Sequence, residues 1–247
     1  MMMNDIVILS LSVLPVLILG IYVYRKDKFN KEPIGMIIKA FCGGILSIPI
    51  ALFFDSVVEN IIPGEGAFYN AFFQAGITEE SAKWLIFMIF IWKNRHFDEY
   101  IDGIVYACFI SLGFACVENI LYVFSTETFT SALGTGFMRG VLAVPAHFLF
   151  AVLMGYYLAM AKFGGHTVFN LALSLIFPIL AHGIYDFLLM FTDTLEQAGL
   201  EFLIFAIFVV FIYFDIKLWK IGIRRIMRMM DRTQVERNNI RFRNIFK

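Results

Sequence analysis

The chain of 247 residues contains little charge: only 16% of its residues are Asp, Glu, Lys or Arg, against roughly 25% in an average soluble domain. Hydrophobic residues make up 60% of it. This balance excludes an ordinary soluble globule, a disordered chain and a collagen-like fibre. The 20 basic residues equal the 20 acidic ones in number, so the net charge is zero and by itself uninformative. We expect no nucleic-acid partner.

Cysteine is scarce as well. Cys42, Cys108 and Cys116 all lie inside apolar runs, which favours neither a disulfide framework nor a zinc ribbon. We interpret all three as small buried residues.

Long apolar runs are what the sequence has in abundance. A helix that crosses a bilayer needs about 20 mostly apolar residues, and continuous rather than alternating runs favour helices over a barrel. We therefore predict an all-α, polytopic membrane helix bundle with about seven transmembrane helices, at residues 5–24, 34–55, 71–92, 101–124, 137–161, 167–190 and 201–221. The first run lacks a basic start and a small-residue cleavage site, which predicts a retained span rather than a signal peptide.

The loops alternate in charge, and this predicts the topology. One set carries nearly all the Lys and Arg residues: 25–33, 93–100, 162–166 and the C-terminal end. The alternate set has only acidic charges: 56–70, 125–136 and 191–200. The positive-inside rule then predicts an N-out/C-in protein in the cell membrane. We divide it into one transmembrane catalytic domain, 1–221, and a basic cytoplasmic tail, 222–247, which is either an amphipathic surface helix or a stop-transfer flank.

Charged residues inside the predicted spans are functional-site candidates by default, because a charge in hydrocarbon is costly. Glu79 and Lys83 are four residues apart and Glu80 and Lys83 three, so all three side chains share one helical face. A structural ion pair needs only one acid. The second acid is then available to titrate or to activate water.

The remaining candidates lie on three other spans: Glu118, Asn119, Arg139, His147, His182 and Asp186. The four-residue spacing of His182 and Asp186 places them on one face, where the acid can orient the imidazole. By contrast, Asp98, Glu99 and Asp102 lie at the inner boundary of a span, and we interpret them as ordinary flanking charges.

The depths of these residues agree. Glu79, Glu118, His147 and His182 each lie six to ten residues from the predicted outer boundary of their span, which corresponds to about 9–15 Å. Independent structural pairs have no reason to share one level. We therefore predict a common site in the outer half of the membrane.

Carboxylates, imidazoles, a lysine and an amide suit water activation with oxyanion stabilisation. The predicted reaction is peptide hydrolysis within the membrane, with a glutamate as general base. No Ser occupies a nucleophile elbow and no Cys has a clear His partner, so a covalent nucleophile is disfavoured. No metal or other cofactor is expected. Zinc, held by the four residues that share a depth, is a less favoured alternative because His-Glu-x-x-His is absent.

The chain resembles the PrsW family of intramembrane proteases, which share a clan with the type II CAAX prenyl endopeptidases and their bacterial relatives. The resemblance covers roughly residues 14–190. It is carried by Tyr24 to Lys28 with Glu32-Pro33, Glu79-Glu80-Ser81-Ala82-Lys83-Trp84, Phe97-Asp98-Glu99, Asp102-Gly103-Ile104-Val105-Tyr106, Leu112-Gly113-Phe114-Ala115, Glu118-Asn119-Ile120-Leu121-Tyr122, Pro145 and His147 with Met154-Gly155-Tyr156-Tyr157-Leu158, and His182-Gly183-Ile184-Tyr185-Asp186-Phe187.

The resemblance implies the first, extracytoplasmic-side cut in a membrane-anchored anti-sigma factor, a single-pass partner in the bacterial cytoplasmic membrane. A second protease then releases the sigma factor for a stress response. The family's functional positions fall on Glu79, Glu80, Lys83, Glu118, His182 and Asp186. By similarity to the CAAX endopeptidases, Glu79 activates water and His182 helps to bind the oxyanion.

Two positions depart from the pattern of those relatives, which usually carry His at the position of Glu118 and often Asn at that of Asp186. Asn119, Lys83 or His147 are then alternative oxyanion donors, with Arg139 in a supporting role.

Three other functions stay open. The first is a clan-related peptidase that acts on another membrane peptide or a prenylated one. The second is a proton-coupled transporter, although no repeat or pair of broken spans is visible. The third is a membrane scaffold or sensor, which leaves the clustered acids unexplained.

Overall fold

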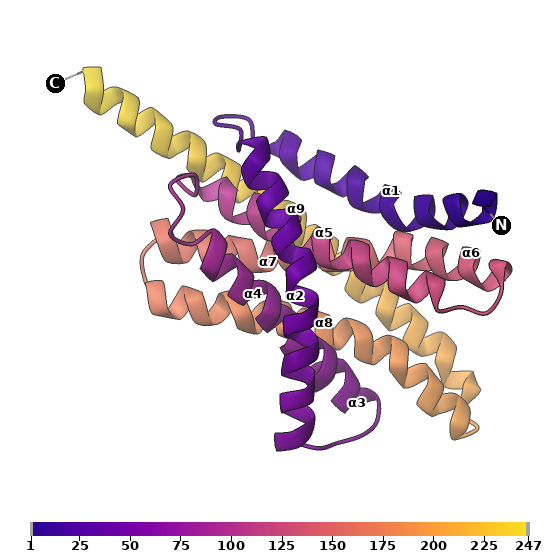
Figure 1. The fold of residues 1–247 in the computed structure, drawn as a ribbon. Helices are drawn as coiled ribbons and strands as arrows, with labels where there is room; N and C mark the ends of the chain where they lie inside the picture. Colours follow the sequence, from indigo (N-terminus) through magenta and orange to yellow (C-terminus); the bar gives the residue numbers. More distant parts are fainter. Residues whose placement is uncertain (1, 246–247) are drawn as a thin grey trace.

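The computed structural model describes residues 2–245, and this range contains helices and no strand. Figure 1 shows the long helices, which are α1 (Met2–Lys26), α2 (Ile34–Ile61), α5 (Tyr100–Phe124), α7 (Val144–Phe163), α8 (Thr167–Gln197) and α9 (Ile204–Ile245). The shorter elements are α3 (Ala67–Tyr69), η1 (Asn70–Ile77), α4 (Thr78–Phe90), α6 (Phe129–Met138), η2 (Arg139–Ala143) and η3 (Glu201–Leu203). Helices satisfy every internal backbone group within the segment, which an apolar environment demands.

Six helical stretches of the described range are long and apolar enough to cross a membrane: Asn4–Lys26, Ile34–Ile61, Tyr100–Phe124, Phe129–Phe163, Thr167–Gln197 and Glu201–Ile240. The predicted polytopic helical bundle is therefore confirmed. The expected third span falls on the contiguous helical stretch 67–90, which is long enough but contains three charged residues, one more than a candidate span is allowed. The count of seven and the orientation stay predictions.

Two boundaries differ from the sequence prediction. The fifth span was expected at 137–161, but its helical structure begins at Phe129, because α6, η2 and α7 follow one another without a loop. The basic tail is not a separate helix, because α9 continues from Ile204 to Ile245 past Gly222. The division into two domains and the position of the tail at the membrane surface stay predictions.

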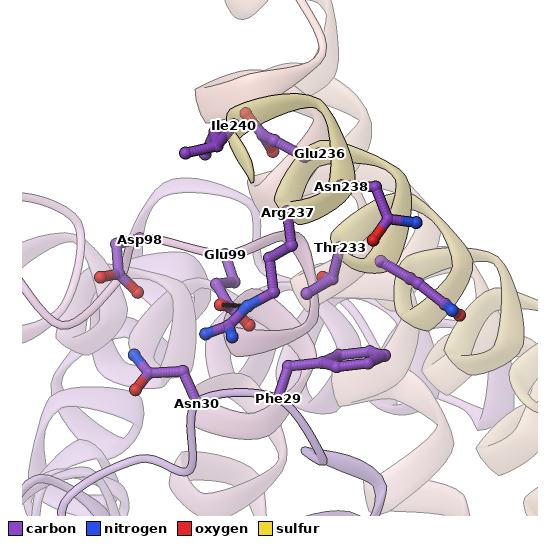
Figure 2. A pocket seen from close by; sticks show the side chains of 10 residues that line it. Phe29, Asn30, Asp98, Glu99, Thr233, Glu236, Arg237, Asn238 and Ile240 are labelled. Atoms are coloured by element: carbon purple, nitrogen blue, oxygen red, sulfur yellow. Dashed lines mark hydrogen bonds and ion pairs between the residues drawn. The ribbon is translucent and has the colours of Figure 1, made fainter. Parts of the chain in front are cut away.

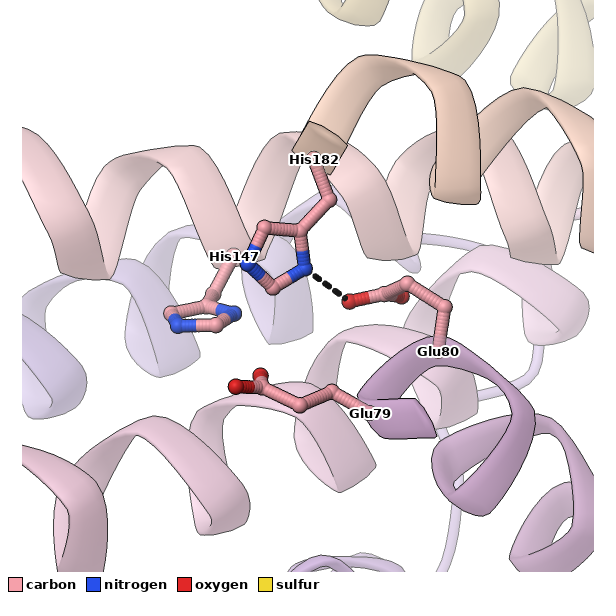
Figure 3. Close-up of side chains that lie close together, drawn as sticks. All are labelled: Glu79, Glu80, His147 and His182. Carbon is pink, nitrogen blue, oxygen red and sulfur yellow. Dashed lines mark hydrogen bonds and ion pairs between the residues drawn. The ribbon is translucent and has the colours of Figure 1, made fainter. Parts of the chain in front are cut away.

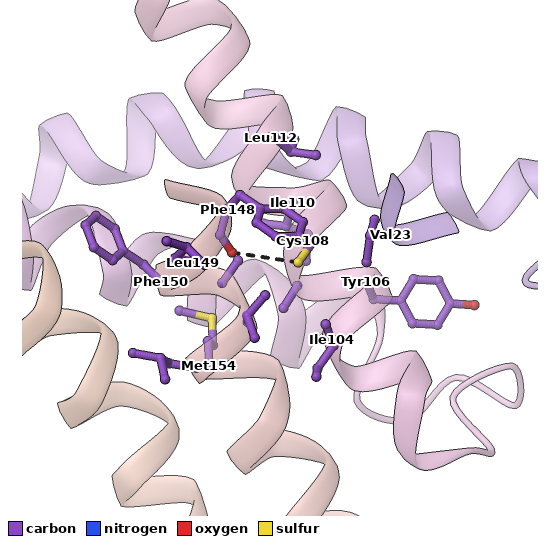
Figure 4. Close-up of a cluster of buried hydrophobic side chains, with 14 of the residues drawn as sticks. Val23, Ile104, Tyr106, Cys108, Ile110, Leu112, Phe148, Leu149, Phe150 and Met154 are labelled. Atoms are coloured by element: carbon purple, nitrogen blue, oxygen red, sulfur yellow. Dashed lines mark hydrogen bonds between the residues drawn. The ribbon is translucent and has the colours of Figure 1, made fainter. Parts of the chain in front are cut away.

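Helices α5 and α7 form the centre of the bundle. Most of their residues are buried, and Figure 4 shows part of the core that they share. Their backbones meet at two glycines, since a Cβ on Gly155 would lie 2.2 Å from the carbonyl oxygen of Gly103. Helix α2 crosses α5 just as closely, because a Cβ on Gly44 would lie 1.9 Å from the carbonyl oxygen of Ile110. Such small residues let membrane helices pack backbone to backbone.

The outer surface is apolar in the way that a lipid-facing surface must be. Large side chains such as Leu17 on α1, Phe53 on α2 and Phe205 on α9 are more than half exposed, whereas soluble monomers rarely expose contiguous apolar patches of this kind. Cys42 belongs to this surface, so the prediction that all three cysteines are buried was wrong for that one. Ile38 and Leu46, one turn before and one turn after Cys42 on α2, are also exposed, while Cys108 and Cys116 lie on the central α5.

Two wide π-helical segments lie a few residues before two of the site candidates, Glu79 and His147. Segment η1 ends at Ile77, two residues before Glu79, and η2 ends at Ala143, four residues before His147. Pro145 has no N–H to donate to the preceding turn, which explains a widened turn there. Segments of this kind are frequent at functional sites.

Candidate active site

Lys83 lies at the centre of the polar residues inside the bundle. Its Nζ donates to Glu80 Oε1 at 2.8 Å and to Glu79 Oε2 at 3.1 Å, and it lies 3.2 Å from His147 Nδ1. The ammonium also sits 4.0 Å above the centre of the Phe114 ring. The lysine is 1% exposed, so these contacts supply all the compensation that its buried charge has.

His182 bridges two carboxylates. Its Nδ1 lies 3.0 Å from Glu80 Oε1, and its Nε2 lies 3.1 Å from Asp186 Oδ2, one turn further along α8. The ring of Phe150 stacks on the imidazole, with the centroids 4.8 Å apart. Both nitrogens and one face of the ring are therefore fixed. Figure 3 shows the imidazole directed at Glu80, with Glu79 and His147 alongside.

Two basic side chains of the α6–η2–α7 stretch contact Glu118. His147 Nε2 lies 2.8 Å from Glu118 Oε2, and Arg139 Nη2 lies 2.9 Å from the same oxygen. Arg139 Nε also donates to Asn119 Oδ1 at 2.7 Å, and Asn119 Nδ2 donates to the Ser12 carbonyl at 3.4 Å. Asn119 therefore fixes the arginine, and the arginine fixes Glu118.

These contacts join all nine residues that the sequence singled out. We call the eight ionisable members the acid–histidine cluster: Glu79, Glu80, Lys83, Glu118, Arg139, His147, His182 and Asp186. The cluster has a closed side and an open side. The Glu80 and Lys83 side chains are 0% and 1% exposed, whereas those of Glu79, Glu118 and Asp186 are 17%, 18% and 20% exposed.

The convergence agrees with the depths inferred from the sequence, although the catalytic roles stay predictions. Two aromatic contacts were missed. Phe114 lies four residues before Glu118 and hence on its helical face, which is a signal that the sequence contains. Phe150 comes three residues after His147 but stacks on His182 of another helix, and no sequence spacing reports such a contact.

Four side chains of the cluster can hold a metal ion. One ligand atom from each of Glu79, Glu80, His147 and His182 lies within 4.8 Å of the others, and Glu80 Oε2 is buried without a hydrogen-bond partner. Nitrogen and oxygen donors of this kind suit zinc. Formally, the four carboxylates of the cluster outnumber Lys83 and Arg139 by two negative charges before the histidines are counted. The donor set therefore fits a divalent ion, which would have to compete with the Lys83 ammonium.

The amino-acid sequence matches those of known proteins over most of its length. The family model described as "PrsW family intramembrane metalloprotease" matches residues 32–214. Protease PrsW of Bacillus subtilis is 37% identical over 220 residues, which cover 88% of this chain and 93% of that protein. Protease PrsW of Oceanobacillus iheyensis is 43% identical over 186 residues, or 74% of this chain and 82% of that protein.

Protease PrsW of Clostridioides difficile is 36% identical over 230 residues, which cover 91% of this chain and 92% of that protein. No solved structure matches the chain significantly. The family match spans all the residues of the acid–histidine cluster. The chain thus belongs to the PrsW family of intramembrane proteases and is a multi-pass bacterial membrane protein with peptidase activity.

Proposed function

We propose that the protein makes the first, extracytoplasmic-side cut in a membrane-anchored anti-sigma factor, and that Glu79 activates the attacking water. The difference between the two adjacent glutamates carries the proposal. Glu80 is fully buried, and both Lys83 and His182 contact its Oε1. Glu79 makes one ion pair, to Lys83, and is 17% exposed. Of the two acids, only Glu79 can meet both water and a substrate.

In this proposal Glu79 removes a proton from water as the oxygen attacks the scissile carbonyl carbon. Glu79 then returns the proton to the leaving nitrogen, so that the peptide bond breaks and the carboxylate is restored. Lys83 stabilises Glu79 as an anion before the attack. Glu80 holds both Lys83 and His182 and is a positioning residue.

Stabilisation of the tetrahedral oxyanion falls to His182. Its Nε2 lies beside Asp186, whose side chain is 20% exposed and can yield to a substrate carbonyl. Asn119 is disfavoured as the donor, because its amide nitrogen donates to Ser12 and its oxygen accepts from Arg139. We assign it, together with Arg139, to the positioning of Glu118.

The choice of substrate rests on the family and on depth. The positive-inside prediction places the acid–histidine cluster in the outer half of the membrane, which agrees with a cut near the extracytoplasmic face. A single-pass helix presents one peptide segment at that level. An anti-sigma factor with one membrane anchor has this form.

A metal-dependent variant of the same function has its own support. The matching family is described as a metalloprotease, and the four donors fit a metal ion. A bound zinc ion would supply a more acidic water and polarise the substrate carbonyl. Glu79, Glu80, His147 and His182 would hold it, so the two variants of the function predict opposite responses to a chelator.

The deciding experiment follows cleavage of a single-pass anti-sigma factor by the purified protein in liposomes, with products identified by mass spectrometry. We expect Glu79→Gln to lower kcat/KM by about 10²–10⁴-fold, the usual contribution of a general base. Glu127→Gln, in an exposed loop position, is the matched control and should cleave like the wild type. A strong chelator should leave the wild-type rate unchanged.

Each of the other outcomes identifies the part of the proposal that is wrong. Activity lost with chelator and restored by zinc supports the metal variant. Equal cleavage by Glu79→Gln removes Glu79 as the base. Cleavage of prenylated or other membrane peptides, but not of the anti-sigma factor, supports a clan relative with another substrate. Proton flux without any cleavage supports the transporter alternative.

A further inference from the structure

A second group of acids lies at the opposite end of α5 from Glu118. We call it the loop-end acid cluster: Asp27, Glu32, Asp98, Glu99 and Asp102. The first two belong to the loop between α1 and α2, and the others to the start of α5 and the residues before it. One carboxylate oxygen from each of Asp27, Glu99 and Asp102 lies within 4.8 Å of the others, as does one from each of Glu32, Asp98 and Asp102. Asp102 is thus common to both triads.

Three of these acids share an arrangement that points to a ligand. Asp27, Glu32 and Asp102 are 0%, 2% and 0% exposed. In each, one oxygen accepts from the protein: Asp102 Oδ2 from the Glu99 N–H, Asp27 Oδ2 from the Glu32 N–H, and Glu32 Oε2 from the Tyr106 hydroxyl. The other oxygen, Oδ1 of the aspartates and Oε1 of Glu32, is buried with no hydrogen-bond partner. The same holds for Oε2 of Glu99, whose Oε1 pairs with Arg237.

Buried oxygens without partners are rare in proteins and call for an explanation such as a bound ion. Protein hydrogen bonds to one oxygen of a carboxylate orient the other one, in the way that outer contacts orient metal ligands. Nearby cations do not balance the five acids. Arg237 pairs with Glu99, whereas the amine of Lys31 lies over the Tyr24 ring and that of Lys162 donates to the Trp92 carbonyl.

An aqueous route reaches this cluster. A cavity of about 790 Å³ is lined by Phe29, Asn30, Asp98, Glu99, Thr233, Gln234, Glu236, Arg237, Asn238 and Ile240. Figure 2 shows Glu99 and Asp98 facing it, with Arg237 reaching across from α9. Helix α9 is held there by Thr233, whose hydroxyl accepts from the Ile101 N–H at 3.2 Å. Water and small ions can therefore enter between the α1–α2 loop and α9.

We propose that the loop-end acid cluster binds one hard divalent cation, such as Mg²⁺ or Mn²⁺, through the unpartnered oxygens of Asp27, Glu99 and Asp102, the triad that also faces the cavity at Glu99. All-oxygen, carboxylate-rich sites that keep some water ligands suit these ions. The bound cation links the α1–α2 loop to the start of α5. It is distinct from any ion in the acid–histidine cluster, whose donors include two imidazoles.

The test uses the purified full-length protein in nanodiscs of zwitterionic lipid, with Mn²⁺ as the probe and electron paramagnetic resonance to measure free Mn²⁺. We expect one Mn²⁺ per chain with submillimolar affinity, displaced by Mg²⁺. Asp27→Asn and Glu99→Gln should each weaken binding by about 10-fold or more. Arg237→Gln should strengthen it a few-fold, because that guanidinium competes with the cation for Glu99.

Two control variants locate the site. Glu236→Gln removes an exposed acid from the same cavity and should bind like the wild type. Glu79→Gln alters the acid–histidine cluster and should also bind Mn²⁺ like the wild type. The proposal is overturned if the wild type binds no more Mn²⁺ than empty nanodiscs, if both cluster variants bind normally, or if Glu79→Gln abolishes binding. A melting temperature of the wild type that rises with Mg²⁺, and rises less in Glu99→Gln, supports the proposal independently of how Asp27→Asn folds.

Discussion

The two groups of acids differ in how their charge is balanced. In the acid–histidine cluster, every carboxylate contacts a lysine, an arginine or a histidine of the same group. In the loop-end acid cluster, the described residues provide one ion pair for five acids, between Arg237 and Glu99. Chemistry that must occur repeatedly benefits from charges fixed in advance, whereas unpartnered oxygens leave room for a ligand. The same side-chain type thus serves two purposes in one bundle.

The two clusters are physically connected through α5. Asp102 lies in its first turn, and Glu118 lies near its other end. Because α5 is buried between α2 and α7 and meets both backbone to backbone, it is poorly placed to shift without disturbing its neighbours. Each cluster is therefore best tested by variants that alter its charges and leave this packing intact.

The largest expected effect comes from removing the central charge. Lys83→Met leaves Glu79 and Glu80 without their ammonium partner, and loss of one partner in a buried ion pair costs about 3–5 kcal/mol. We expect a drop of this order in the free energy of unfolding, measured by detergent titration in mixed micelles. Adding Glu80→Gln should recover part of it. Lys39→Met, at an exposed lysine of α2, is the control; equal stability of the two single variants would contradict a central role for Lys83.

A smaller effect is expected at the edge of the same cluster. Arg139→Lys keeps the charge but cannot reach both Glu118 and Asn119 with a planar fork. Loss of one charged hydrogen bond of about 1.5–3 kcal/mol should lower kcat/KM by at least about 10-fold, with the protein still folded. Cleavage kinetics in liposomes measure it, with Arg224→Lys on the exposed face of α9 as the control. Wild-type kinetics for Arg139→Lys would show that cleavage does not depend on the way Arg139 positions Glu118.

The smallest effect concerns the loop-end acid cluster without metal. Burial raises the pKa of Glu32 from its ordinary value of 4.5 to about 7. A raised carboxyl pKa means that the folded state holds the proton more tightly, so this stabilisation is complete below pH 4.5 and is lost as the pH rises through about 7. In chelated buffer the melting temperature should fall over this range. Glu32→Gln should flatten the profile, and Mg²⁺ should restore stability above pH 7. A flat wild-type profile would contradict a protonated Glu32.

Much of this protein could be predicted from local patterns. Apolar runs located six of the spans, because each segment that crosses the membrane must by itself be apolar and must satisfy its own backbone hydrogen bonds. The third was recognisable only as an apolar run interrupted by Glu79, Glu80 and Lys83. The free-energy cost of placing a charge in hydrocarbon marked the charged residues of the spans as candidates. Equal depths then indicated that those on four different helices belong together.

What the sequence could not provide was the choice of partners across helices. Asp98, Glu99 and Asp102 were interpreted as boundary charges, because the residues that complete their cluster lie some 70 positions earlier in the chain, at Asp27 and Glu32. Asn119 was considered as an oxyanion donor, but Arg139 and Ser12 already occupy its amide. Such contacts follow from helix packing and have no signature in spacing.

The sequence by itself therefore determined the class of protein, the approximate spans and the residues of the acid–histidine cluster, because hydropathy and the cost of buried charge act locally. The tertiary structure alone decided which glutamate is enclosed and which is accessible, since Glu79 and Glu80 are adjacent in the chain and differ only in what packs around them. It also decided that the acids of the α1–α2 loop meet those of α5, because close backbone packing of α2 on α5 brings those loops to one end of the bundle.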